Sequence, residues 1–221
     1  LRRSSAASDV YKRQAMGMVR HDAYALLLQG NDVLTFLNGL STNRVEGACT
    51  TVLTNRSAKI VDVCEVVPVG EHVALIGYAP HKQSLVAHLT ERILGQDVSI
   101  TDISHLNDVF IGTGEDEFPE GTTHHNSMFG SMAIVPVRHE WQASWDQEAW
   151  TEHRIEHQIP FYAHEITQKV NPLKAGLSDL VHPQKGCYIG QEVLTRMRTR
   201  NSIDYVTVSY THLRAHETQR N

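Results

Sequence analysis

The sequence predicts an α+β fold in which helices pack on a largely antiparallel sheet. Segments rich in apolar and β-branched residues follow one another with turn residues between them, and two helical segments interrupt this series. The resulting order of elements is β-α-β-β-β-α-β, which is typical of helices covering an antiparallel sheet. The chain has 221 residues, enough to bury a sizeable core in one large domain or two small ones.

The first predicted α+β domain covers residues 15–113. Its elements follow from apolar runs, β-branched residues, capping residues and turns. The expected strands are 23–30, 50–54, 60–69, 72–79 and 97–103, followed by the apolar segment 107–114. The expected helices are 32–40, which Asp32 can cap, and 80–95, with Pro80 near its first turn and an apolar residue at every fourth position.

A second α+β domain is predicted for residues 132–207, with a strand at 132–139 and helices at 146–157 and 190–200. Residues 114–131 before it are polar and rich in turn residues, so we expect a loop or domain boundary there. The two ends, 1–14 and 208–221, have neither apolar periodicity nor capping residues and resemble translated adapter sequence. We therefore treat both ends as non-native flanks that do not contribute to the fold.

The composition excludes several classes of function. The net charge is −5 and the two flanks are themselves basic, so the core is acidic, which argues against a general nucleic-acid coat. No apolar run approaches the roughly 18 residues of a membrane span. The cysteines, Cys49, Cys64 and Cys187, form no CxxC pair, which predicts a cytoplasmic protein without a disulfide framework. His124 and His125 lack partners at ligand spacing, so no metal site is predicted.

The segment KGCYIGQE at residues 185–192 is the strongest candidate for a site. Gly186 and Gly190 are expected to adopt positive φ and to let a ligand approach the backbone closely. Cys187 lies near the start of a predicted helix and beside Lys185, which should lower its pKa and make it reactive. A small buried thiol in a tight turn fits the same residues equally well.

This motif and four other segments resemble the folate-binding YgfZ family, which is related to the aminomethyltransferase (T-protein) of glycine cleavage. The other segments are HRIEHQIPFYAHEI, NPLKAGLSDLVHPQ, FLNGLSTN and LTNRSAKIVDV, and the likeness extends over about residues 23–201. It implies interlocked, ferredoxin-like α+β domains around a central opening that takes a tetrahydrofolate. A C-terminal β-barrel is implied beyond the part of the family that this sequence covers.

The resemblance also assigns site residues. The cysteine that distinguishes the family falls on Cys187, and one carboxylate of the acidic pair in T-protein-like chains falls on Asp62, with Val63 in place of the other. Asp62 could orient or protonate a folate nitrogen, and Arg154 could clamp a carboxylate. The alternatives without a functional role are an outward-facing strand residue for Asp62 and an exposed helix arginine for Arg154. The candidate cofactor-binding residues are Arg154, Glu165, Lys185, Gly186, Tyr188, Gly190, Gln191 and Glu192, whereas Gln158, His164 and Lys174 depart from the family pattern.

Three functions remain open. The resemblance favours a tetrahydrofolate-binding accessory protein for iron–sulfur enzymes, including a tRNA-modifying one, with those enzymes or assembly factors as partners. Cys187 would then be a reactive thiol or a transient ligand of an iron–sulfur cluster shared with a partner, because three dispersed cysteines cannot hold a Cys₄ cluster. The alternatives are a true aminomethyltransferase, disfavoured by Val63, and a non-catalytic RNA-binding module that uses the basic residues between 169 and 200. The acidic core makes direct nucleic-acid binding unexpected.

Overall fold

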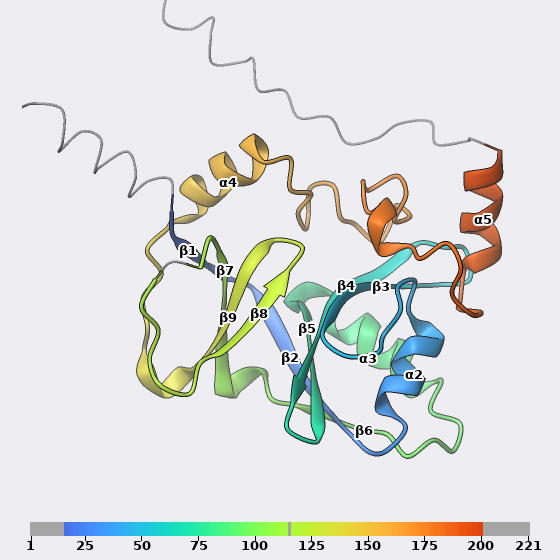
Figure 1. Ribbon diagram of the computed structural model, residues 1–221, viewed down its shortest axis with the longest axis horizontal. Coiled ribbons are helices and arrows are strands. Elements are labelled where there is room, and N and C mark those ends of the chain that lie inside the picture. Colours follow the sequence, from blue (N-terminus) through green and yellow to red (C-terminus); the bar gives the residue numbers. More distant parts are fainter. Residues whose placement is uncertain (1–15, 115, 201–221) are drawn as a thin grey trace, which may run out of the picture.

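The computed structural model describes residues 16–114 and 116–200 and shows a mixed fold of two antiparallel sheets with helices packed around them (Figure 1). The predicted flanks, 1–14 and 208–221, lie outside the described residues. Within the described part of the chain, no helix is long and apolar enough to cross a membrane.

The larger sheet has five strands in the order β3-β4-β5-β2-β6. These are β2 (Ala23–Gln29), β3 (Cys49–Thr54), β4 (Ile60–Val69), β5 (His72–Tyr78) and β6 (Ser99–Asp102), and all neighbours pair antiparallel. Helices α2 (Val33–Leu40) and α3 (Lys82–Thr90) cover one face, where Leu26, Leu37, Leu85 and Leu89 form a buried cluster. The α+β prediction for this part is confirmed, because its strands and helices fall where the apolar patterns placed them.

The smaller sheet has four strands in the order β1-β7-β9-β8. They are β1 (Met18–His21), β7 (Asn107–Gly112), β8 (Thr123–Ser127) and β9 (Gly130–Pro136). Asp22 alone separates β1 from β2, so the chain passes from one sheet to the other at this residue. The expectation of a loop at 114–131 is wrong in part, because β8 lies within it. This strand has polar residues on both faces and a single buried side chain, His125, so it has no apolar alternation.

The main core lies between the two sheets and includes Val63, Ile76, Ile111 and Met132. The segment after β9 closes it, with Trp150 of helix α4 (Gln147–Glu156) packed into the same cluster. Asp146 caps α4 by accepting a hydrogen bond from the Ala149 amide at 2.9 Å. The chain then runs without long regular elements to helix α5 (Gln191–Thr199), which lies at the opposite end of the long axis from α4 (Figure 1).

Two helix boundaries differ from the predictions. The helix expected at 80–95 begins as a 3₁₀ turn, Ala79–His81, and ends at Thr90, after which the amides of Arg92 and Ile93 bond three residues back and tighten the chain. Asp32 precedes α2 but does not cap it, because its carboxylate instead accepts a hydrogen bond from the Asp97 amide at 2.8 Å. Long-range contacts override the local signal in this second case.

Candidate functional site

Asp62 lies on β4 and is fully buried. Its Oδ2 accepts hydrogen bonds from the Tyr24 hydroxyl at 2.7 Å and from the Tyr78 amide at 3.2 Å. Its Oδ1 accepts from the Val63 amide at 2.9 Å and pairs with Nδ1 of His81 at 2.9 Å. Burial raises the pKa of Asp62, and the hydrogen bond and charge of His81 oppose that rise. The alternative of an outward-facing strand residue is therefore wrong.

Gly77 makes room for this arrangement. It is the cross-strand partner of Tyr24, and a Cβ at this position would lie 2.1 Å from the Tyr24 hydroxyl and 2.3 Å from Oδ2 of Asp62. The same hydroxyl lies 3.3 Å from Sγ of Cys64. Burial raises the pKa of both Tyr24 and Cys64 well above their usual values, so both stay protonated at neutral pH. A chain of polar groups thus runs from buried Cys64 to His81, whose side chain is 12% exposed.

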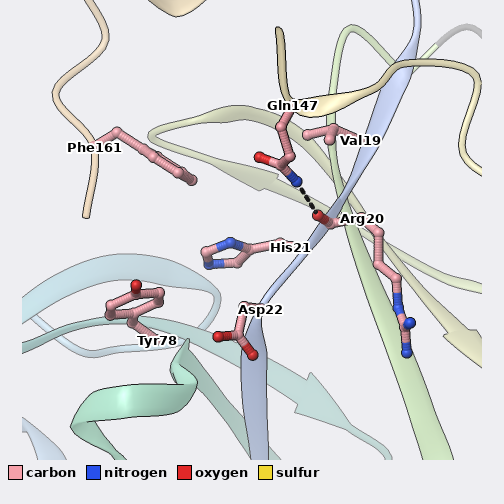
Figure 2. Close-up of a pocket in the computed structure, with 7 residues that line it drawn as sticks. All are labelled: Val19, Arg20, His21, Asp22, Tyr78, Gln147 and Phe161. Atoms are coloured by element: carbon pink, nitrogen blue, oxygen red, sulfur yellow. Dashed lines mark hydrogen bonds between the residues drawn. The ribbon is translucent and has the colours of Figure 1, made fainter. Parts of the chain in front are cut away.

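Aromatic rings border a cavity of about 170 Å³ between the sheets. Figure 2 shows His21, Tyr78 and Phe161 around the same space, with Gln147 of α4 donating a hydrogen bond to the Arg20 carbonyl at 3.1 Å. Burial lowers the pKa of His21 to about 4, so its ring is neutral at physiological pH. The cavity therefore combines the aromatic rings of His21, Tyr78 and Phe161 with the charged residues Arg20 and Asp22, at the point where β1 leads into β2.

Further aromatic side chains and a second cavity adjoin the first cavity. Tyr162 stacks on Tyr78 with ring centroids 4.6 Å apart, and His81 meets the ring of Tyr78 edge-on at 5.2 Å. A second cavity of about 380 Å³ adjoins the first through residues 20–22 and has polar side chains such as Ser104 and Asn107 in its lining. We call His21, Tyr78, His81, Phe161 and Tyr162 the aromatic cluster.

Arg154 of α4 is buried and bound to Glu165. Its Nη1 donates to Oε2 of Glu165 at 3.1 Å, and the same oxygen accepts from the Phe161 amide at 3.0 Å. The alternative of an exposed helix arginine is wrong. Tyr162, in the turn that this pair fixes, donates to the Val63 carbonyl at 2.7 Å. The structure therefore brings Arg154 and Glu165 to the region of Asp62 through residues 161–162.

Lys185 is buried and its ammonium group points into the loop after α2. It donates to the carbonyls of Asn38 and Ser41 at 2.6 Å each and to the carbonyl of Asn43 at 2.9 Å. Burial lowers its pKa to about 8. Because a lysine has three N–H donors, its capacity is filled by these carbonyls. A folate contact by Lys185 stays a prediction, and it would require the exchange of one of these bonds.

The second anchor of the motif is at Ile189 and Gly190. Thr54 donates to the Ile189 carbonyl at 2.5 Å, and Gly190 has the predicted positive φ, +86°. A Cβ there would lie 2.8 Å from the Asn55 carbonyl, so the glycine permits close packing on the turn between β3 and β4. The prediction for Gly186 is wrong, because its φ is ordinary and a Cβ would meet nothing within 4 Å.

Cys187 is exposed between these two anchors. Cys64 is buried, and the half-buried Cys49 has its pKa raised to about 11, mainly by burial and then by the charge of Glu65. The thiol on the motif is thus the accessible one of the three. Among residues 16–114 and 116–200, no group of three or more histidine, cysteine or acidic side chains could hold a metal ion.

The remaining motif residues are bound to neighbours. Tyr188 is half-buried, with Nζ of Lys185 5.5 Å from its ring centroid, and Gln191 donates to the Lys185 carbonyl at 3.4 Å. Glu192 is exposed and pairs with Arg196. Arg198 donates to two carbonyls in residues 178–181. Two of the arginines that the RNA-binding alternative needs are therefore engaged within the chain.

The predicted site residues thus form two groups. Asp62, Arg154 and Glu165 lie around the aromatic cluster, whereas the motif contacts the loop after α2 and the turn after β3. Sequence reasoning missed His81 and Gly77, because nothing local in the sequence marks either as a neighbour of Asp62. The signal for Phe161 and Tyr162 was present, since both lie in a segment that carries the family resemblance.

The fold defines the class of protein to which the chain is similar, that of the aminomethyltransferase T fold. Among solved structures, it matches the glycine cleavage system aminomethyltransferase T from Bartonella henselae with a TM-score of 0.67 and 15% identity, covering 86% of this chain and 66% of that one. No family model and no curated protein sequence matches. At this identity the likeness shows the fold alone, and the chain spans just under two thirds of that structure's length.

Proposed function

We propose that this protein binds a tetrahydrofolate at the aromatic cluster and serves in the assembly or maintenance of iron–sulfur enzymes through the thiol of Cys187. The observation that carries the proposal is an exposed cysteine between two anchors, Lys185 on one side and Ile189–Gly190 on the other. A thiol that served packing would be buried. The YgfZ resemblance supplies the folate and the iron–sulfur role, and it stays a prediction.

The residues around the cavity fit a folate chemically. The rings of His21, Tyr78 and Phe161 offer flat, uncharged faces on which a pterin could stack, and the adjoining cavity offers polar groups for the rest of the molecule. When bound, tetrahydrofolate supplies a carrier for one-carbon groups. The chain's own contribution is to bind and orient the ring and to exclude water from one of its faces.

The cysteines do not fit a resident iron–sulfur cluster. Cys64 is enclosed beside Tyr24, Cys49 is half-buried, and Cys187 is exposed on a separate loop. A thiolate ligand must be deprotonated, and the raised pKa values of Cys49 and Cys64 oppose that. Any cluster would therefore be cargo that Cys187 contacts together with groups from a partner.

The test of this role is complementation in cells that lack their own YgfZ-like protein, with the activity of a [4Fe–4S] enzyme as the readout. We expect wild type to restore the activity and Cys187→Ala to leave it at the level of cells without the protein. Gly47→Ala is the control, since a methyl group there meets nothing within 4 Å and full rescue is expected. Equal rescue by wild type and Cys187→Ala would show that the thiol has no such role.

Folate binding is tested separately, by calorimetric titration of the purified chain with (6S)-5-formyltetrahydrofolate. Saturable binding by wild type and by Cys187→Ala is expected, because the thiol lies outside the aromatic cluster. Absence of binding would contradict the folate part of the proposal. Folate-dependent release of ammonia from a lipoylated carrier would favour the aminomethyltransferase instead.

A further inference from the structure

We infer that His81, and not Asp62, exchanges a proton with the ligand of this site, and that Asp62 is the residue that positions His81. The inference rests on the proposed function in one respect, since it takes the ligand to be a tetrahydrofolate. It reverses the expectation that Asp62 itself orients or protonates a folate nitrogen.

Asp62 has no free position for a ligand. A carboxylate has about four lone-pair sites, and here four protein groups occupy them, two at each oxygen. The side chain is 0% exposed. A ligand atom could bond to Asp62 only by displacing Tyr24, His81 or a backbone amide from the sheet.

His81, unlike Asp62, reaches the surface. Its Nδ1 faces Asp62, which leaves Nε2 as the free ring nitrogen, and its side chain is 12% exposed. When Asp62 is ionised it accepts only, so Nδ1 of His81 then carries the hydrogen and Nε2 the lone pair. The same division holds in a Ser-His-Asp triad, where the aspartate fixes the tautomer of the histidine and stabilises the imidazolium.

The position of His81 suits a ligand in the aromatic cavity. Tyr78 lines that cavity, and its ring contacts His81 edge-on at 5.2 Å. A tetrahydrofolate is larger than a cavity of about 170 Å³, so the bound molecule has to extend beyond it along the aromatic cluster. His81 is the acid–base group that it meets past Tyr78.

The proton step is a simple transfer. Nε2 of His81 takes a proton from a ligand N–H, whose electron pair stays on the ligand nitrogen, and the imidazolium then returns the proton to water at its exposed edge. The titratable groups that face the ring are Asp62, Tyr78 and Tyr162, with Tyr24 and Cys64 behind Asp62. Burial raises the pKa of Tyr162, Tyr24 and Cys64 well above their usual values, so these groups stay neutral.

The first experiment is ¹⁵N NMR of protein labelled at histidine, with the His81 signals assigned through His81→Gln. We expect the Nδ1–H tautomer in wild type and a mixture of tautomers in Asp62→Asn, because an amide can both donate and accept. Tyr24→Phe is the control, since it removes a different hydrogen bond to Asp62 and should leave the tautomer of His81 unchanged. An unchanged tautomer in Asp62→Asn would overturn the positioning role.

The second experiment is titration with (6S)-5-formyltetrahydrofolate across pH. In wild type, the Nε2 resonance of His81 should shift on binding, and the affinity should vary with pH. In His81→Gln, which keeps a donor for Asp62, binding should weaken at least tenfold and lose that pH dependence. Tight, pH-dependent binding by His81→Gln would overturn the inference and leave the folate function standing. Absence of binding by wild type would overturn the proposed function, and the inference with it.

Discussion

Asp62 and Lys185 are buried ionisable residues whose hydrogen-bonding capacity is filled by the protein. Asp62 binds four donors around β4, and Lys185 binds three carbonyls more than 140 residues away in the sequence. A charged group is stable inside a protein only when it is satisfied in this way. Each has a neighbour that reaches the surface, His81 beside Asp62 and Cys187 two residues after Lys185.

Gly77 provides a test at the same scale. Gly77→Ala should destabilise the protein by about 2–3 kcal/mol, because the new methyl group overlaps Tyr24 and Asp62 and forces the sheet to adjust. Gly39→Ala on α2 is the control, since its methyl group meets nothing within 4 Å and alanine favours a helix by about 0.5–1 kcal/mol. Urea unfolding of both variants measures the difference. A Gly77→Ala protein as stable as wild type would contradict the described packing.

Among the strands, β4 and β8 are linked across the two sheets by a buried hydrogen bond between His125 and Glu65. Nε2 of His125 lies 3.0 Å from Oε2 of Glu65, which also accepts from the Thr50 hydroxyl at 2.6 Å. Both side chains are at most 6% exposed. The pair explains why a strand as polar as β8 belongs to the fold, since its one buried side chain meets a partner on the other sheet.

Breaking this pair should be costly. His125→Ala leaves the carboxyl group of Glu65 buried without its hydrogen-bond partner on β8, and we expect a loss of about 1–3 kcal/mol in the free energy of unfolding. The double variant Glu65→Leu/His125→Leu should lose less stability than His125→Ala, because two apolar side chains leave neither partner of the hydrogen bond buried and unpaired. His124→Ala on the exposed face of β8 is the control, with an expected change within about 0.5 kcal/mol. Urea unfolding measures the free energy of unfolding of the three variants. A double variant less stable than His125→Ala would contradict the prediction.

At the scale of the whole molecule, the fold buries two histidines that must be neutral, His21 on β1 and His88 on α3. Burial lowers the pKa of His21 and of His88 from 6.5 to about 4 in each case. The unfolded chain therefore binds protons at these residues at a higher pH than the folded chain does. The burial of these neutral histidines therefore contributes to the free energy of unfolding above pH 6.5, and this contribution is lost as the pH falls from 6.5 to 4.

Substitution of His21 tests this pH dependence at a single residue. Between pH 7 and pH 5 the wild-type protein should lose about 2 kcal/mol of unfolding free energy through His21, because the lowered pKa favours the unfolded state in acid. His21→Phe, which keeps a ring in the aromatic cluster, should lose correspondingly less over the same interval. His105→Gln, at an exposed position, should behave like wild type. Urea unfolding at both pH values compares the three proteins, and an equal loss in His21→Phe would refute the prediction.

The sequence by itself determined the elements whose signals are local. The strands at 60–69 and 72–79, helix α2 and the positive φ of Gly190 all follow from patterns within a few residues. The motif around Cys187 was equally visible, because its unusual neighbours are adjacent in the chain.

The tertiary structure decided which residues meet across long separations. It assigned β1, β7 and β8 to the second sheet, paired Asp62 with His81, and bonded the Lys185 ammonium group to carbonyls at the end of α2 and in the loop after it. Hydrogen-bond partners and burial depend on the packing of distant segments, and local periodicity does not encode them. For that reason the sequence could identify local elements and candidate residues, whereas the contacts of these residues had to come from the tertiary structure.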